Sequence, residues 1–334
     1  MVFSNGERIY VSRQAEVCTM RIMFMSSRQL GETVLQRLVE RGENVAGVAS
    51  LVVAPGTTNR MKEAATRLGI PYVEAKNGRS PEFYEQYIKL KPDLNIMARF
   101  RTIVPESILN YPKLGTIGWH PSLLPKYAGA DSLTWAIIFG ETKTANTILW
   151  TDKGIDTGPI LLQKEVEISP DDTSASLYHD KITPGAVETI VEAVDLIKNR
   201  TAPRIPQDLS RYSYYSFITE KDALINWVQP AKRIYDLIRG TNPYPGATTH
   251  FQDRPFKVLD SELHLGFEGS ALDAVTVAAI KAGGVIDITS QGIKVVAPDG
   301  VILIKAVNAD GSKITAAHFA DQVGLKVGDR FGMH

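Results

Sequence analysis

MRIMFMSSRQLGETVLQRLVERG, residues 20–42, joins a short apolar run to a polar loop and then to apolar residues at helical spacing. The run at 20–25 is typical of a buried strand, and the pattern after it predicts a helix. A strand, a tight loop and a helix in this order begin a parallel α/β sheet. We therefore expect an α/β fold in the N-terminal part of the chain, with a Rossmann-like, mostly parallel sheet and helices on both faces.

The same alternation continues along the chain. Further buried strands are expected at 44–53, 93–98, 115–119, 146–150 and 159–166. Helical spacing predicts helices at 60–69, 80–91, 104–110 and 131–141, with Ser80 as an N-cap. A longer helical stretch covers 171–200. Pro184 predicts a break in it, because proline removes a helix hydrogen bond and clashes with the preceding turn.

A second domain is indicated after residue 200. Residues 201–216 carry prolines and aromatics without helical spacing, which predicts a domain boundary. After one more helix at 229–240, β-branched runs and turn signals take over, with hairpin turns expected at PDG (298–300) and ADG (309–311). We divide the chain into an N-terminal extension of unknown role at 1–19, a Rossmann-like domain at 20–205, a linker at 206–220 and a smaller antiparallel β-domain at 221–334.

Composition limits the partners of the protein. The 37 basic side chains balance the 37 acidic ones, so nucleic acid is an unlikely partner without a local basic patch, and no such run is present. One cysteine, Cys18, excludes an internal disulfide framework. No secretory signal and no apolar run of about eighteen residues occurs, so we expect a cytoplasmic protein without a membrane span. The sequence leaves the oligomeric state open.

Common cofactor motifs are missing from the expected positions. The first strand-to-helix loop, SSRQLGE at 26–32, contains neither G-x-G-x-x-G nor a phosphate-binding P-loop. No H-E-x-x-H motif and no Cys/His cluster suggests zinc. We therefore expect neither NAD nor a metal.

The candidate chemistry lies in two segments, GTIGWHPSLLP at 115–125 and DKGIDTGPI at 152–160. His120 closes an apolar strand, and Asp156 stands on a glycine-rich turn. A histidine can donate or accept a proton near neutral pH, and an aspartate beside it can orient the ring or accept a proton. His120 and Asp156 are therefore a candidate acid/base pair in one cleft.

This pairing resembles the 10-formyltetrahydrofolate-dependent formyl-transfer superfamily, whose pattern is Asn-x-His-Pro-Ser-Leu-Leu-Pro followed later by an Asp two residues before Gly-Pro. The resemblance implies that His120 polarises the formyl carbonyl and supplies a proton. It implies that Asp156 orients His120 and accepts the proton of an attacking water. Gly118 occupies the place of the Asn and has no side chain to donate to an oxyanion, a loss that typically costs about 3 to 4 kcal/mol.

Three further segments, ILLQKEVEISPDDTSASLY (160–178), APRIPQ (202–207) and INWVQPAKRIYDLIRGTNPYPGA (225–247), resemble the hydrolase domain of 10-formyltetrahydrofolate dehydrogenase and, more distantly, methionyl-tRNA formyltransferase. The resemblance covers about residues 20–313. It implies an OB-like β-barrel for the C-terminal domain and 10-formyltetrahydrofolate as the formyl donor.

Hydrolysis of this donor to formate and tetrahydrofolate is the activity that the resemblance and Gly118 favour. Transfer of the formyl group to an amine, such as aminoacyl-tRNA, an amino sugar or an amino acid, is the first alternative. A folate-binding protein with residual activity is the second.

The resemblance also implies a pterin slot lined by residues 99–104 and 150–155, with Ile103 and Val104 as its apolar wall. Arg99 or Arg101 is expected to pair with the glutamate tail of the folate. The residues expected to contact the folate are Arg99, Ile103, Val104, Leu124, Pro125, Trp150, Thr151, Asp152, Gly154 and Ile155.

Overall fold

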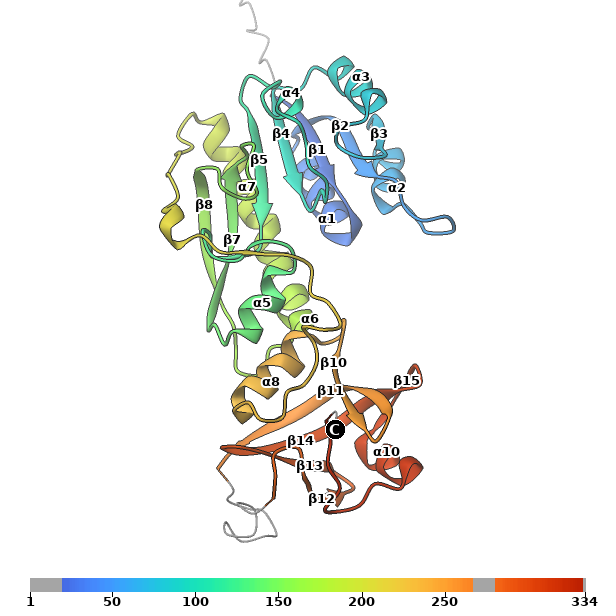
Figure 1. Ribbon diagram of the computed structural model, residues 1–334. Helices are drawn as coiled ribbons and strands as arrows, with labels where there is room; N and C mark the ends of the chain where they lie inside the picture. The colour runs from blue at the N-terminus through green and yellow to red at the C-terminus, as the bar shows by residue number, and fades with distance from the viewer. Residues whose placement is uncertain (1–19, 267–279, 333–334) are drawn as a thin grey trace, which may run out of the picture.

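A computed structural model describes residues 20–266 and 280–332 and shows two domains, each built on its own sheet (Figure 1). The expected extension at 1–19 lies outside the described residues. The N-terminal domain has a seven-stranded sheet in the order β3-β2-β1-β4-β5-β7-β8. The strands are β1 (Arg21–Ser26), β2 (Asn44–Leu51), β3 (Tyr72–Ala75), β4 (Leu94–Ala98), β5 (Thr116–His120), β7 (Lys143–Trp150) and β8 (Ile160–Glu167).

The mostly parallel sheet expected from the sequence is confirmed. Strands β3, β2, β1, β4 and β5 pair in parallel, and β7 and β8 continue the sheet in antiparallel fashion. β1 lies between β2 and β4, and its residues from Ile22 to Met25 are fully buried. The unbroken apolar run of this strand therefore reflects burial on both faces of the sheet.

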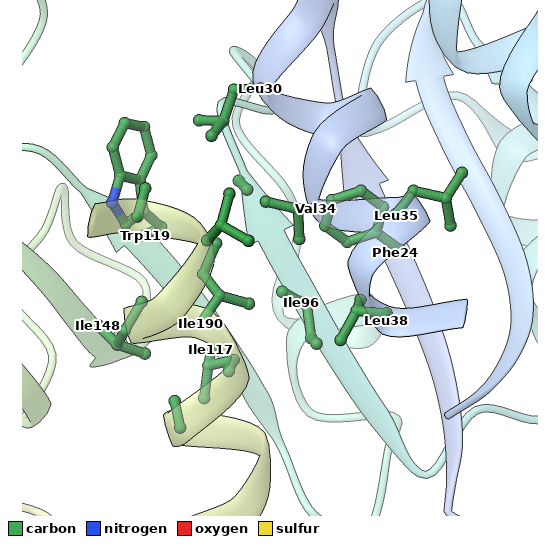
Figure 2. Packing of buried hydrophobic residues seen from close by; sticks show 14 of the residues in the cluster. Phe24, Leu30, Val34, Leu35, Leu38, Ile96, Ile117, Trp119, Ile148 and Ile190 are labelled. Carbon is green, nitrogen blue, oxygen red and sulfur yellow. The ribbon is translucent and has the colours of Figure 1, made fainter. Parts of the chain in front are cut away.

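Helices cover both faces of this sheet, as the sequence predicts. On one face, α1 and α7 pack against the strands through Leu35 and Ile190, which join the cluster of Phe24, Ile96 and Ile117 (Figure 2). On the other face, Phe83 and Tyr87 of α3 meet Met23 and Met25 of β1. The helices of this domain are α1 (Arg28–Glu40), α2 (Arg60–Arg67), α3 (Pro81–Lys89), α4 (Glu106–Leu109), α5 (Ser132–Ile138), α6 (Ser174–Ser176) and α7 (Thr183–Lys198).

The break expected at Pro184 does not occur. The helical path runs from α6 through a π-helical segment, η1 (Leu177–Ile182), into α7, where Pro184 occupies the first turn. Proline is tolerated at such a position because the amide of the first turn needs no helical partner. The irregularity lies before the proline, as a widened turn that carries Tyr178 and His179.

The C-terminal domain is an antiparallel sheet in the order β10-β11-β14-β13-β12, with β15 paired to β14. Its elements are β10 (Ala247–Phe251), β11 (Arg254–Leu265), β12 (Val285–Thr289), β13 (Gly292–Ala297), β14 (Gly300–Ala309), β15 (Ser312–Thr315) and α10 (Ala316–Val323). The hairpin turns expected at PDG and ADG join β13 to β14 and β14 to β15. Among the described residues the pairing runs as an open path, so closure into an OB-like barrel stays a prediction.

Helix α8 (Ala231–Gly240) joins the two domains. It packs against α5 of the N-terminal domain and β11 of the C-terminal one. The buried Arg239 guanidinium contacts the carboxylate of Asp236 at 2.8 Å and donates a hydrogen bond to the carbonyl of Asp172 at 2.9 Å. A buried charge is tolerated when it is paired and hydrogen-bonded, so this contact fixes α8 against the N-terminal domain. No helix in the described ranges combines the length and apolar character needed to cross a membrane.

The segment expected to be a linker, 206–220, runs along the N-terminal domain rather than through solvent (Figure 1). It contains a 3₁₀ turn, η2 (Leu209–Arg211), and a short strand, β9 (Tyr214–Tyr215), which pairs in parallel with β6 (Ala128–Gly129). The Asp131 carboxylate accepts a hydrogen bond from the amide of Ile218 at 3.2 Å. The connection between the domains thus also covers the segment that follows β5.

Candidate active site

His120 is the last residue of β5, a strand that is buried along its whole length. Only 6% of the residue is exposed. Gly118 lies two positions earlier and therefore on the same face of the sheet. The end of this strand holds the imidazole at the carboxyl edge of the parallel sheet, where open α/β sheets bind their ligands.

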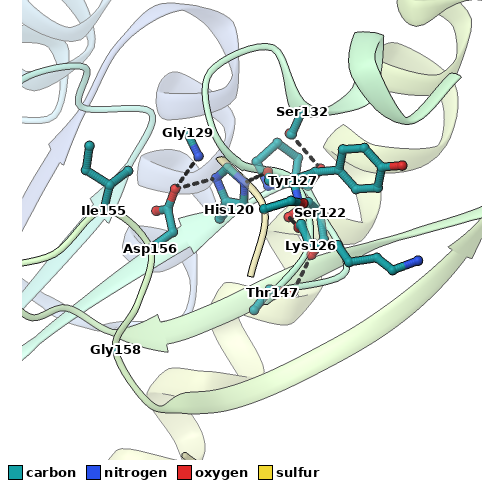
Figure 3. Close-up of polar contacts among 12 residues, drawn as sticks. His120, Ser122, Lys126, Tyr127, Gly129, Ser132, Thr147, Ile155, Asp156 and Gly158 are labelled. Carbon is teal, nitrogen blue, oxygen red and sulfur yellow. Dashed lines mark hydrogen bonds and ion pairs between the residues drawn. The ribbon is translucent and has the colours of Figure 1, made fainter. Parts of the chain in front are cut away.

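Both ring nitrogens of His120 face protein oxygens (Figure 3). Nε2 lies 2.8 Å from the carbonyl oxygen of Tyr127, and Nδ1 lies 3.5 Å from Oδ2 of Asp156. A carbonyl only accepts, so Nε2 carries a hydrogen and donates it. Nδ1 is then the ring nitrogen that can take up a further proton, and it faces the carboxylate of Asp156, which accepts. The pair can therefore carry a proton on Nδ1 and donate it to a substrate.

Main-chain groups position Asp156. The amide of Gly129 donates to its Oδ2 at 2.9 Å, and the backbone of Asp156 is left-handed with φ of 55°. The Gln207 side-chain amide donates to the carbonyls of Asp156 at 2.8 Å and Gly158 at 2.7 Å. Aspartate tolerates this left-handed backbone better than most residues. The turn is thus held from two sides, with 23% of the Asp156 side chain exposed.

The loop between β5 and α5 is tied down so that the Tyr127 carbonyl stays beside His120. Ser122 donates to the Lys126 carbonyl at 2.8 Å, and Thr147 donates to the Ser122 carbonyl at 2.6 Å (Figure 3). The Tyr127 ring stacks on that of Tyr215, with centroids 5.6 Å apart. Burial raises the pKa of the Tyr127 hydroxyl, and its hydrogen bond to a glutamate raises it further. This hydroxyl therefore stays protonated at neutral pH and serves as an anchor.

Gly118 lies close to two neighbouring side chains. A Cβ built on it would lie 3.0 Å from Cγ2 of Thr151 and 3.6 Å from Cδ2 of Leu149. Met97 on β4 lies opposite Gly118 in the register and is partly buried. The face of the sheet next to His120 is therefore lined by apolar side chains, without an amide donor at position 118.

The residues expected to contact folate fall into different surroundings. Ile103 is 62% exposed and Ile155 is 46% exposed. Val104 packs in the core beside α3, and Trp150 belongs to the cluster on the α1 and α7 face. Leu124 lies in the same loop as Tyr127 and packs against Ala128 and Leu149.

Three of the other expected residues, Thr151, Asp152 and Gly154, lie in the loop after β7, and Pro125 lies in the loop after β5. Asp152 accepts hydrogen bonds from the Gly154 amide at 2.9 Å and from the Thr157 hydroxyl at 2.8 Å, so it stabilises its own turn. The Thr151 hydroxyl donates to the Thr116 carbonyl at 3.2 Å. Pro125 follows a cis peptide bond. Contact of any of these residues with folate stays a prediction.

Arg99 and Arg101 follow β4. The Arg99 guanidinium carbon lies 5.2 Å from the centroid of the Tyr178 ring, and its Nε is buried without a hydrogen-bond partner among the described residues. Arg101 lies 5.2 Å from the Phe217 ring centroid and 3.6 Å from the Asp131 carboxylate. Both arginines are therefore close to the carboxyl edge of the sheet.

The sequence did not reveal Tyr127, Gly129 and Gln207 as parts of the site. The first two act through a carbonyl and an amide, which no side-chain pattern marks. A weak signal for Gln207 was its place in APRIPQ, one of the segments that carried the resemblance. Within the described residues, no group of three or more His, Cys, Asp or Glu side chains is placed to hold a metal ion.

The sequence matches the Formyl transferase family over residues 20–194 and the C-terminal domain of the same family over residues 217–323. The methionyl-tRNA formyltransferase of Syntrophus aciditrophicus is 34% identical over 298 residues, which are 87% of this chain and 92% of that protein. The human cytosolic 10-formyltetrahydrofolate dehydrogenase is 32% identical over 307 residues, which are 90% of this chain and 34% of that protein.

Among solved structures, HypX from Aquifex aeolicus in complex with tetrahydrofolic acid matches with a TM-score of 0.62 and 21% identity, over 93% of this chain and 48% of that one. At this identity the match reports the fold alone. The expected superfamily is thus confirmed by both domain matches and by relatives that align along about nine tenths of the chain. This protein belongs to the formyl transferase family.

Proposed function

We propose that this protein transfers a formyl group from 10-formyltetrahydrofolate to an amine. The family uses this donor, and relatives named methionyl-tRNA formyltransferase align with nearly their full length. The single observation that carries the proposal is the pairing of His120 with Asp156 at the end of β5, with Nδ1 and Oδ2 3.5 Å apart. A cytoplasmic location stays a prediction.

The proposed chemistry uses His120 as a proton donor and Asp156 as a proton acceptor. The amine nitrogen of the acceptor bonds to the formyl carbon, and negative charge develops on the carbonyl oxygen. A proton on Nδ1 of His120, which lies 3.5 Å from Asp156, stabilises this charge, while Nε2 keeps its hydrogen bond to the Tyr127 carbonyl. Asp156 accepts the proton that the amine loses. The bond between the formyl carbon and N10 then breaks, N10 takes a proton from the pair, and formylated amine and tetrahydrofolate leave. General acid–base catalysis by positioned groups of this kind contributes roughly 10²- to 10⁴-fold in rate.

We place the donor on the face of the sheet that carries Gly118. There the pterin would lie between Met97 and the loop at 151–156, with its formyl group next to His120. The exposed side chains of Ile103 and Ile155 support this placement, because apolar side chains at the rim of a cleft bury a planar ring.

Hydrolysis of the donor is a second candidate, and Gly118 favours it. An amide donor at this position would stabilise the oxyanion, and its absence slows attack by any nucleophile. Water then competes with a slow amine, because it is present at a much higher concentration than the amine. Formate would be the product.

The test is to incubate the purified chain with 10-formyltetrahydrofolate, with and without amines, and to quantify formate and formylated product. In the His120→Ala variant, the rates at which formate and formylated product form are each expected to fall at least 10²-fold. The exposed His318 on α10 offers the matched control, and His318→Ala is expected to keep full activity. Formylated product in excess of formate supports transfer, and formate alone supports hydrolysis. Full turnover in His120→Ala would refute both.

A further inference from the structure

Three arginines, Arg28, Arg99 and Arg101, follow the carboxyl ends of the central strands β1 and β4. β1 and β4 are neighbours, and the chain continues from β1 towards β2 and from β4 towards β5. Arg28 follows β1, while Arg99 and Arg101 follow β4. The Ser27 hydroxyl donates to the Arg99 carbonyl at 2.8 Å and so holds the two loops together. Open α/β sheets bind ligands in the crevice at such a switch point.

The cluster carries more positive charge than its surroundings balance. Asp131 pairs with Arg101, and within the described ranges no acidic side chain is seen to pair with Arg28 or Arg99. Arg28 is also the first residue of α1, where the helix dipole disfavours a cation. Burial lowers the pKa of Arg101, and the charges of Arg99 and, more weakly, Arg28 lower it further, against the opposing effect of Asp131. Such an arrangement is stabilised when an anion binds.

The location of the cluster separates it from the face proposed for the donor. In the register of β4 and β5, Ala98 pairs with Trp119, so Arg99 and His120 are the next residues on adjacent strands. The Arg99 side chain extends to Tyr178, which packs on the α1 and α7 side of the sheet. Met97 and Gly118 lie towards the opposite face. A ligand held by the arginines therefore reaches His120 from the edge of the sheet.

The arginines are also joined to the catalytic loop. Asp131, the partner of Arg101, lies two residues after Gly129, whose amide holds Asp156. Both residues belong to the segment between β5 and α5. A group bound to Arg101 thus lies one short stretch of chain away from the acid/base pair.

We propose that Arg28, Arg99 and Arg101 bind a phosphate ester on the amine acceptor and so hold the amine at His120. This inference rests on the proposed transfer function and names its acceptor class. The three guanidinium groups and the Asp131 carboxylate together have a net charge of +2. A phosphate monoester carries a charge of up to −2 at neutral pH, which this net charge balances. Planar guanidinium forks also match phosphate geometry.

The rival occupant is the glutamate tail of the folate. Other cations could pair with the carboxylates of that tail. Ile103 borders an open depression of about 650 Å³, and Lys76 and Arg79 are part of its lining. The depression lies on the side proposed for the donor. A carboxylate tail therefore does not need the arginines at the switch point.

The experiment measures two affinities of the full chain by calorimetry, one for inorganic phosphate and one for 5-formyltetrahydrofolate. Arg101→Ala and, on the other loop, Arg28→Ala are each expected to weaken phosphate binding at least 10-fold and to change folate binding less than 2-fold. Arg101→Lys should recover part of the loss. Arg254→Ala, an exposed change on β11, is the matched control and should leave both affinities unchanged. Thermal unfolding of each variant verifies folding.

Three results would overturn the inference. Wild-type protein that does not bind phosphate refutes it, as does a loss of phosphate affinity in Arg254→Ala equal to that in Arg101→Ala. The third is weaker binding of 5-formyltetrahydrofolate, but not of 5-formyltetrahydropteroate, in Arg101→Ala, because only the former carries a glutamate tail. Failure of the transfer function is recognised separately, by full formyl turnover in His120→Ala.

Discussion

Replacement of Asp156 by Asn tests the role of the acid/base pair most directly. Asn has the same shape, and it tolerates the left-handed backbone at this position. Its carbonyl oxygen can still accept the hydrogen bond from the Gly129 amide, at 2.9 Å in the present structure. The substitution therefore removes one negative charge and one proton acceptor while it keeps the turn.

The size of the effect follows from the separation of the two groups. When the His120 ring carries a second proton, it and the Asp156 carboxylate are unit charges 3.5 Å apart, which attract by about 5 kcal/mol at an effective dielectric constant of about 20. Asp156 keeps 23% of its side chain exposed, and solvent screening reduces this to about 3 kcal/mol. Since about 1.4 kcal/mol corresponds to a tenfold change in rate, kcat should fall roughly 10²-fold. The lost proton acceptor can only add to this.

The assay follows consumption of saturating 10-formyltetrahydrofolate, together with the Kd of 5-formyltetrahydrofolate. We expect a lower kcat with a Kd within threefold of the wild-type value. Asp180→Asn, at an exposed position of η1, is the control for a general loss of negative charge. The reasoning is refuted by a kcat of Asp156→Asn within threefold of wild type, or by an equal loss in Asp180→Asn.

Three further variants test other parts of the structure. Gly118→Asn adds an amide donor and requires only a small shift of the Thr151 methyl group, so kcat should rise about tenfold. Gly118→Ala adds a side chain without a donor, so its kcat should not rise. Gly129→Ala is strained because the backbone at this position has a φ of 96°, and its Cβ would clash with the carbonyl oxygen of Tyr215. Both the Tm and kcat should therefore fall, and an unchanged Tm would contradict the packing described. Burial raises the pKa of Asp172, but a lysine, a backbone amide and a serine hydroxyl together lower it below the ordinary value. The carboxylate therefore stabilises the fold above about pH 4 and ceases to do so as the pH falls through its folded-state pKa. Asp172→Asn should accordingly lower the free energy of unfolding in urea by about 1 to 3 kcal/mol at pH 7. The difference in unfolding free energy between variant and wild type should become smaller as the pH falls. A difference that does not change with pH would exclude this explanation.

Much of the sheet could be predicted because buried parallel strands appear in the sequence as unbroken apolar runs. β1, β2, β4 and β5 were all expected close to their observed bounds. β3 was missed, since it has only four residues at the edge of the sheet and alternates buried with exposed side chains. The π-helical turn before Pro184 was also missed, because a proline in a helical pattern predicts a break without showing where the chain absorbs it.

The site was predictable only in its side chains. His120 and Asp156 could be paired because each lies in a segment with a recognisable pattern. The Tyr127 carbonyl and the Gly129 amide complete the pair from the main chain, so their roles depend on the path of a loop. The arginine cluster joins residues from two separate loops, and single arginines carry no signal of such a meeting.

Residues 206–220 connect the two domains and also pack against the candidate site in the N-terminal domain. Gln207 supports the turn that carries Asp156, Tyr215 stacks on Tyr127, and the amide of Ile218 donates a hydrogen bond to Asp131 at the start of α5. A truncation that stops at residue 205 therefore removes three supports of the candidate site, whereas one that stops beyond Ile218 keeps them. For the same reason, a chimera that gives this domain a foreign C-terminal sheet keeps an intact centre only when the crossover lies downstream of that residue.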